Sequence, residues 1–169
     1  MKKSLASLGL VLALILGIAL VPGLVSAAEY SYAGPPAFTV TYPGGADKDK
    51  TGDMVWAVIT GAGLHIEVSV GPIPAGIELK DYAAKAYLPG LEASQGAKAK
   101  MGDNKEITLA DGTKAYYSEM NWNHVQSGGT PITTMMVTVY KDGKYVNVAD
   151  HPWDNYGVAE KIVKSLKFK

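Results

Sequence analysis

The chain has 169 residues, with 16 basic and 16 acidic side chains, a formal net charge of zero and no cysteine. Every basic residue is a lysine. Nucleic-acid sites depend on arginine for bidentate contacts to bases and phosphates, so a near-neutral chain without arginine is a poor candidate for a nucleic-acid-binding protein. Without cysteine there are no disulfides and no thiol chemistry, and the fold must be stabilised by packing alone.

The first 28 residues predict a secretory signal peptide. Lys2 and Lys3 precede an almost wholly apolar run, Leu8–Leu20, and small residues follow up to Ala28. This layout is typical of a cleaved leader, and the apolar run is shorter than the ~20 residues of a spanning helix, which is the alternative. No cysteine follows the run and Lys2-Lys3 is not a twin-arginine pair, so we expect Sec-type export without a lipid anchor. Residues 29–169 are then one mature domain, periplasmic or secreted, with no membrane segment after cleavage.

The first half of the mature chain predicts an extended lead-in followed by three strands. The lead-in is Glu29–Pro36, and the strands are Phe38–Tyr42, Met54–Thr60 and Leu64–Val70. In the last of these, Ile66 and Val68 alternate with His65 and Glu67, which places the two polar side chains on one face. The second and third strands are close enough in sequence to form a hairpin.

From Leu79 the apolar spacing changes to that of an amphipathic helix. The apolar positions are Leu79, Tyr82, Ala83, Ala86 and Tyr87. Their three-four spacing predicts one buried face. Because proline removes a backbone donor, we expect the helix to end or kink at Pro89-Gly90.

Two hairpins are predicted around Asp-Gly pairs, which favour tight turns between strands. The first joins Lys98–Leu109 to Thr113–Trp122 through Asp111-Gly112. A two-residue loop would pair Ile107 with Tyr116 and Glu106 with Tyr117.

The second predicted hairpin joins Pro131–Tyr140 to the strand that ends at Asp150, through Asp142-Gly143. A two-residue loop pairs Val139 with Val146 and Val137 with Val148, which gives one apolar face. A closing helix follows, with Asp154 as its N-cap. Its apolar stripe, which we expect to pack on the valine face, is Val158, Ala159, Ile162, Val163 and Leu166.

These elements predict an α+β domain. Its largely antiparallel sheet of about six to seven strands would lie between helices, as an α/β/α sandwich.

The same elements resemble the PsbP-like superfamily. The resemblance lies in FTVTYP, PAGIELKDYAAKAY, ITLADGTKAYYSEMNW, VTVYKDGKYVNV and AEKIVKSLKF, which together span most of Phe38–Phe168. It implies an antiparallel sheet between helices and a binding or accessory role. It supplies no shared catalytic residues, because these motifs are core positions and turns.

Metal-dependent chemistry is the first enzymatic alternative. It would need at least two of His65, Glu67, His124 and His151 within ligand distance of one another. No spaced zinc motif such as H-E-x-x-H is present, and three surface or strand-end histidines are the simpler interpretation.

A calcium loop is half-matched by Asp47–Asp53. Asp47, Asp49 and Thr51 alternate as oxygen donors before Gly52, but the twelfth position is Val58 instead of a bidentate glutamate. A polar turn without metal is the favoured interpretation.

Polar-tipped aromatic residues gather at two strand ends. Trp122 and His124 end one strand, and Trp153 and Tyr156 lie between the last strand and the last helix. Such residues can form a ligand or partner patch, although core packing of Trp122 and capping of the sheet by Trp153 is the simpler interpretation.

The sequence therefore predicts an exported, non-catalytic PsbP-like protein that binds an envelope protein or a small ligand through its surface. We assign no catalytic, cofactor or metal residues from sequence alone. The alternatives are an exported hydrolase or metal-dependent enzyme, and a carrier with a cavity between sheet and helix beside Thr138, Tyr140 and Tyr145.

Overall fold

The computed structural model describes residues 27–43, 47–51, 55–61, 64–96, 98–125, 128–152 and 156–169. Its strands are β1 (Ala27–Tyr32), β2 (Phe38–Pro43), β3 (Asp47–Thr51), β4 (Val55–Gly61), β5 (Leu64–Pro72), β6 (Ala99–Thr108), β7 (Lys114–His124), β8 (Thr130–Lys141), β9 (Lys144–Asp150) and β10 (Lys167–Phe168). Its helical elements are η1 (Leu79–Asp81), η2 (Ala83–Tyr87), α1 (Leu88–Gln95) and α2 (Tyr156–Val163).

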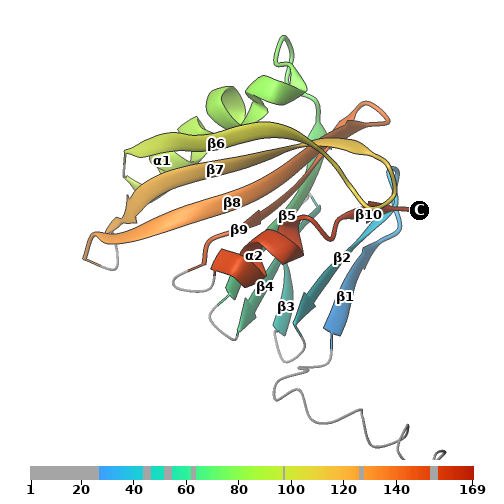
Figure 1. Cartoon of the computed structure of the whole chain (residues 1–169), viewed down its shortest axis with the longest axis horizontal. Coiled ribbons are helices and arrows are strands. Elements are labelled where there is room, and N and C mark those ends of the chain that lie inside the picture. The colour runs from blue at the N-terminus through green and yellow to red at the C-terminus, as the bar shows by residue number, and fades with distance from the viewer. Residues whose placement is uncertain are drawn as a thin grey trace, which may run out of the picture.

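The strands form two antiparallel sheets (Figure 1). The larger sheet has the order β3-β4-β5-β9-β8-β7-β6, and the smaller has the order β1-β2-β10. The larger sheet joins the two predicted hairpins through β8 and β7, and β5 then pairs with β9 across a long sequence separation. The α+β class and the antiparallel character of the main sheet are therefore as predicted.

The main hairpin has the predicted register. Val139 pairs with Val146 and Val137 with Val148, and the turn residues Asp142 and Gly143 have φ values of 52° and 73°. Positive φ at both positions is the type I′ turn whose twist matches that of the strands.

One face of the main sheet carries the larger core. The alternate valines of β8 and β9 pack there against Ile162 and Leu166, as predicted from the apolar stripe. The smaller sheet packs into the same core through Phe38, Val40 and Phe168. This face is thus covered by α2 and by the three-stranded sheet together. The predicted α/β/α sandwich did not include this second sheet.

The other face is covered by the helical segment 79–95. Tyr82 packs there against Tyr140 and Tyr145, with ring centroids 6.1 and 5.1 Å apart. Beside them Thr138 is buried and donates a hydrogen bond to Asn147. Of the side chains that suggested a ligand cavity, Tyr140 and Tyr145 are therefore in contact with the helical segment.

Pro89 does not end this segment. The residues before it form a π-helical turn, η2, in which the N–H of Leu88 donates to the carbonyl of Ala83. A wider turn accommodates the proline ring, which would clash with the carbonyl four residues earlier in a regular helix. The helix then continues to Gln95 and ends at Gly96, which has a φ of 64°.

The hairpin around Asp111-Gly112 differs from the prediction by one residue. Ile107 pairs with Ala115 instead of Tyr116, and Glu106 pairs with Tyr116 instead of Tyr117. The reason is a three-residue loop, in which Leu109 donates to the carbonyl of Thr113 and Gly112 has a φ of 85°. The Asp-Gly dipeptide is compatible with this three-residue loop and with the two-residue turn, because glycine readily adopts a positive φ.

With this register Tyr117 lies in the larger core, where it is 1% exposed. Met120 and Trp122 lie on the opposite face, under the helical segment.

The predicted extended lead-in is confirmed in part, because its first residues belong to strand β1. Two further elements differ from expectation. Lys167-Phe168 forms β10 instead of continuing the closing helix. Asp47–Thr51 forms strand β3, paired with β4, instead of a polar loop. Asp154, the predicted N-cap, lies outside the described residues.

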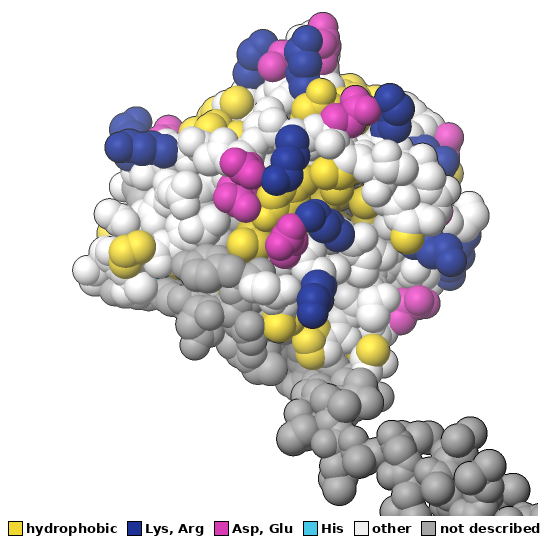
Figure 2. Space-filling view, in the orientation of Figure 1, with side chains coloured by type: hydrophobic (Ala, Val, Ile, Leu, Met, Phe, Trp, Pro, Cys, Tyr) yellow, Lys and Arg dark blue, Asp and Glu magenta, His cyan; other side chains and the backbone are white. Residues whose placement is uncertain are grey.

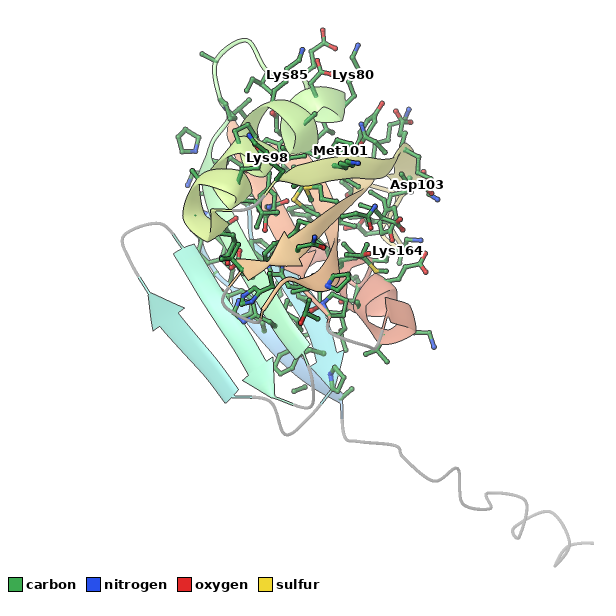
Figure 3. The ribbon with its side chains drawn as sticks, turned by 90° about the vertical axis from the view of Figure 1, so that its left-hand side faces the viewer. Lys80, Lys85, Lys98, Met101, Asp103 and Lys164 are labelled. Atoms are coloured by element: carbon green, nitrogen blue, oxygen red, sulfur yellow. The ribbon has the colours of Figure 1, made fainter. Side chains whose placement is uncertain are left out.

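Charged side chains of both signs are scattered over the face in Figure 2, several of them next to one of opposite sign. Lys105 pairs with Asp103 on β6, and Lys164 pairs with Glu160 on α2. Lys80 and Lys85 point outward from the helical segment (Figure 3). Among the described residues no helix is long and apolar enough to cross a membrane.

Candidate metal centre

A row of polar side chains crosses the main sheet where β9 ends. Ile66 pairs with Asp150, so the next position of the ladder places His65 opposite His151, whose N–H donates to the carbonyl of His65 at 3.0 Å. Continuation of the β8–β9 register places Thr134 on the other side of His151. All three side chains lie on the face that the helical segment covers, because side chains alternate along each strand.

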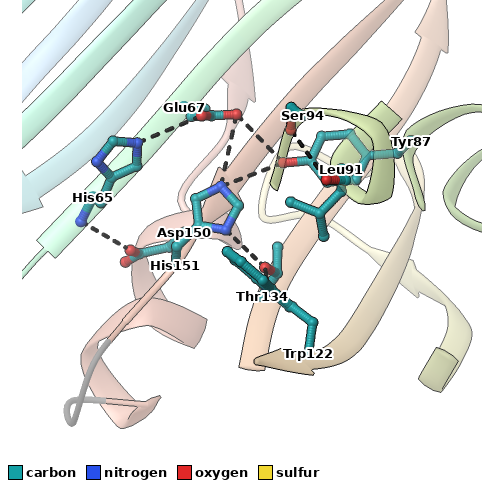
Figure 4. Close-up of polar contacts among 9 residues, drawn as sticks. All are labelled: His65, Glu67, Tyr87, Leu91, Ser94, Trp122, Thr134, Asp150 and His151. Atoms are coloured by element: carbon teal, nitrogen blue, oxygen red, sulfur yellow. Dashed lines mark hydrogen bonds and ion pairs between the residues drawn. The ribbon is translucent and has the colours of Figure 1, made fainter. Parts of the chain in front are cut away.

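Glu67 joins this row from the position two residues after His65. Its Oε1 lies 3.4 Å from Nε2 of His65, and its Oε2 lies 3.7 Å from Nε2 of His151 (Figure 4). One ligand atom from each of the three residues lies within 4.8 Å of the other two. The arrangement is a compact group of two imidazoles and one carboxylate.

The group sits between the core and the solvent. The His151 side chain is 10% exposed, that of Glu67 is 27% exposed and that of His65 is 41% exposed. Ala149, the residue opposite Glu67 on β9, is fully buried in the cluster with Tyr82. Because His65 is the most exposed of the three residues, the group is open to solvent on its side.

The electrostatics of the group favour an ionised carboxylate. Burial alone would raise the pKa of Glu67, but its hydrogen bonds to His151 and His65 outweigh burial and hold that pKa well below its ordinary value. Glu67 is thus an anion with two imidazoles directed at it, and this is the charge state in which a carboxylate binds a cation.

A fourth side chain reaches the group from the helical segment. The hydroxyl of Tyr87 donates to Oε2 of Glu67 at 3.4 Å and lies 3.4 Å from Nε2 of His151. Burial, and then the negative charge of Glu67, raise the pKa of Tyr87 well above its usual range. The tyrosine is a neutral phenol in this setting.

Two further residues fix the ring of His151. Its Nδ1 lies 2.7 Å from Oγ1 of Thr134, and the indole N–H of Trp122 donates to the same oxygen at 2.9 Å. Partners of this kind on the second ring nitrogen orient a histidine and direct Nε2 to the centre of a metal site. The three residues His151, Thr134 and Trp122 are all buried.

Asp150 supports the row from the opposite face of the sheet. Its Oδ1 accepts a hydrogen bond from the backbone N–H of His65 at 3.4 Å. Burial raises the pKa of Asp150 to about 6, and the charges of His151 and His65 counter only part of this effect. Asp150 therefore positions the backbone of His65 without reaching the three ligand atoms.

The chemistry of the group matches borderline transition metals better than calcium. Imidazole nitrogen suits zinc, copper, iron and nickel, whereas calcium takes oxygen ligands only. Two histidines and one glutamate are also the protein ligands of several catalytic zinc ions.

The sequence interpretation of the histidines needs correction. Of the four residues named for metal chemistry, His65, Glu67 and His151 are brought together. All three histidines lie near strand ends, as the simpler interpretation held, but His151 is buried instead of partly exposed, and the ring of His124 lies 5.5 Å from that of Trp122, outside the group. The shared face of His65 and Glu67 was visible in the sequence, but the pairing of β5 with β9 was not.

The predicted aromatic patch is described only in part. Trp122 is 5% exposed and packs against Leu91 and Ile132, with its ring 6.1 Å from that of His151. Trp153 and the side chain of Tyr156 lie outside the described residues, so the patch stays a prediction.

The half-matched calcium loop has a different backbone from the one it needs. Asp47, Asp49 and Thr51 belong to strand β3. The backbone of a strand is extended, whereas the backbone of an EF-hand loop turns around one ion. Asp53 lies outside the described residues.

Solved structures with the same fold support the architecture. The structure of cyanobacterial PsbP (CyanoP) from Synechocystis sp. PCC 6803 superposes with a TM-score of 0.67 at 16% identity, covering 92% of this chain and 99% of that one. The Ran-binding protein Mog1p from Saccharomyces cerevisiae superposes with a TM-score of 0.59 at 11% identity, covering 85% and 95%. A Bacteroides thetaiotaomicron protein gives a TM-score of 0.50 at 11% identity, covering 83% of this chain and 48% of that one.

The chain therefore has the PsbP/Mog1 fold, as the sequence resemblance implied. No protein-family model matches the sequence, and no curated protein matches it. At these identities the superpositions establish architecture, and function has to be argued from the site itself.

Proposed function

We propose that this protein is an exported, non-catalytic binding protein of the PsbP/Mog1 fold, and that its ligand is a divalent transition-metal ion held by His65, Glu67 and His151. The observation that carries the proposal is the convergence of these three side chains from β5 and the end of β9, with ligand atoms within 4.8 Å of one another. The hydrogen bonds that orient His151 and the low pKa of Glu67 support the same conclusion.

Calorimetric titration of the mature protein with Zn²⁺ tests the binding. We expect one site per chain and no heat from Ca²⁺ at the same concentration, because two of the donors are nitrogen. Zinc at 100 times the dissociation constant should raise the melting temperature by roughly 5–10 °C, since binding to the folded state alone adds about 2.7 kcal/mol.

Single substitutions assign the ligands. His65→Ala, Glu67→Gln and His151→Ala should each weaken zinc binding by about 100-fold or more, beyond the 10–100-fold typical of outer partners. His124→Ala and Glu106→Gln are the matched controls, because they remove a histidine and a carboxylate outside the group. Zinc binding that survives all three ligand substitutions would place the ion elsewhere.

Export is tested separately. We expect cleavage after Ala28 or one residue earlier, so that the mature chain begins within β1. Mass spectrometry of the protein from a periplasmic or secreted fraction gives the N-terminus directly. A full-length chain in the membrane fraction would favour the retained anchor.

A zinc-dependent hydrolase is the second candidate, because two histidines and one glutamate also bind catalytic zinc and because His65 opens to solvent. The zinc-loaded protein should then cleave ester or peptide substrates, and His151→Ala should abolish this cleavage. Zinc binding without any turnover supports the binding protein.

A further inference from the structure

We infer that Tyr87 supplies the fourth ligand oxygen of the proposed metal centre, so that a bound ion links the helical segment 79–95 to the sheet. The positive charge of the ion favours the ionised phenolate, and the phenol proton leaves to solvent when the ion binds. The inference rests on the proposed function and assigns a residue from a different layer of the fold to the same site.

The distances around Tyr87 carry this inference. Ligands about 2.0–2.1 Å from a tetrahedral zinc ion lie roughly 3.3–3.4 Å from one another. The Tyr87 oxygen lies 3.4 Å from Oε2 of Glu67 and 3.4 Å from Nε2 of His151, and the other oxygen of Glu67 lies 3.4 Å from Nε2 of His65. With 3.7 Å between Oε2 of Glu67 and Nε2 of His151, the Tyr87 oxygen and these two atoms form a triangle close in size to one face of such a tetrahedron, and His65 lies on the side of the other Glu67 oxygen.

The backbone explains why Tyr87 can reach this corner. It is the last residue of the π-helical turn Ala83–Tyr87, which Pro89 follows two residues later. A π-turn adds one residue to the helical repeat and turns the side chains after it to a new direction, and such turns are frequent at functional sites. The ring of Tyr87 packs against buried Leu91 and Trp122, which holds the hydroxyl over Glu67.

Two hydrogen bonds join this segment to the sheet near its ends. The side-chain amide of Asn104 donates to the carbonyl of Lys80 at 2.9 Å, and the backbone N–H of Ala99 donates to the carboxylate of Glu92 at 2.9 Å. Tyr87 lies between these two hydrogen bonds along the segment, and its hydroxyl points toward the candidate metal centre. An ion bound to Tyr87 would therefore fix the middle of the segment, including the π-turn.

Zinc titration of Tyr87→Phe tests the assignment. We expect its zinc affinity to fall by about 100-fold or more, beyond the 10–100-fold typical of outer partners, while the ring and its packing stay in place. Tyr82→Phe is the matched control, because it removes a hydroxyl from the same segment beneath Tyr140 and Tyr145, away from Glu67. The control should bind zinc as the unmodified protein does.

Hydrogen exchange provides the second measurement. Saturating zinc should slow amide exchange across residues 83–95 in the unmodified protein, and should leave this segment unchanged in zinc-loaded Tyr87→Phe. If Tyr87→Phe keeps full affinity and shows the same protection, Tyr87 is not a ligand, although the three-residue site stands. If the unmodified protein binds no zinc, the proposed function itself fails, and the two failures are thereby distinguished.

Discussion

Oγ1 of Thr134 lies 2.7 Å from Nδ1 of His151, on neighbouring strands of the main sheet. The same oxygen accepts the indole N–H of Trp122. Both lone pairs of the hydroxyl are used if His151 donates through Nδ1, and this tautomer leaves Nε2 free to accept a metal ion. Thr134 thus connects a buried tryptophan to the candidate centre.

Thr134→Val tests this connection. Valine keeps the shape but removes both hydrogen bonds, so we expect zinc affinity to fall by about 10–100-fold. Stability should also fall by about 1–3 kcal/mol, because the indole N–H loses its buried partner. Thr138→Val on the same strand is the control: it removes a buried hydroxyl bonded to Asn147 and should leave zinc affinity unchanged. Equal affinity losses in both variants would mean a general effect on the sheet.

Asp111 should make stability depend on pH. Burial would raise its pKa, but backbone donors, first among them the N–H of Phe168 at 2.7 Å, lower it below 3.8. The folded state then binds fewer protons than the unfolded state, so this contribution is present above pH 3.8 and is lost as pH falls through the lowered pKa.

Urea unfolding at pH 7 and pH 3 measures the effect of Asp111. We expect Asp111→Asn to lose up to about 1 kcal/mol at pH 7, because Asp111 is exposed and water screens its charge, and to differ less from the unmodified protein at pH 3. Asp142→Asn in the other Asp-Gly turn is the control, because asparagine accepts a positive φ. A constant difference at both pH values would contradict a role for the charge.

Gly71 allows the ring of Tyr145 to lie on the backbone of the neighbouring strand. A Cβ at this position would come within 2.7 Å of a ring carbon of Tyr145. We expect Gly71→Ala to destabilise the protein by about 1–3 kcal/mol through overpacking. In a Tyr145→Ala background the same change should have little further effect, and a thermal-melting double-mutant cycle measures this coupling. Gly157→Ala, with open space around its Cβ, is the control.

Ile162 tests the packing of α2 on the main sheet. Its side chain is 3% exposed within the larger core, so Ile162→Ala should cost about 2–5 kcal/mol. The neighbouring Lys161 is exposed, and Lys161→Ala should change the unfolding free energy by less than about 0.5 kcal/mol. Denaturant unfolding of both variants gives the comparison, and similar losses would mean that α2 is held by something other than this face.

Local chemistry in the sequence predicted much of the fold. The register of the β8–β9 hairpin follows from a turn that needs positive φ at two positions, and few residues satisfy that need as well as Asp142-Gly143. The same dipeptide at Asp111-Gly112 was misread, because a three-residue loop needs positive φ at one position only. Which loop forms depends on where Tyr117 packs, and this is a tertiary property.

The candidate metal centre depends on contacts between residues that are far apart in the sequence. His65 and Glu67 could be placed on one face from alternation, but His151 joins them only because β5 pairs with β9. Tyr87 reaches the site through a π-turn, whereas the apolar spacing predicted a regular helix. The pairing of distant strands and non-standard helical turns leave little signal in the local sequence. The sequence therefore predicted only that His65 and Glu67 share a face.

Strand β6 forms one edge of the main sheet, and its irregularity limits how the protein can meet other chains. The register of its pairing with β7 shifts between Met101 and Asn104, and Lys100 and Lys105 flank the shift. An extended peptide that added itself to this edge would lose its hydrogen-bond ladder at the bulge and would meet charged side chains on either side. Capture of a partner by strand addition is blocked here, and recognition along this flank has to use side chains.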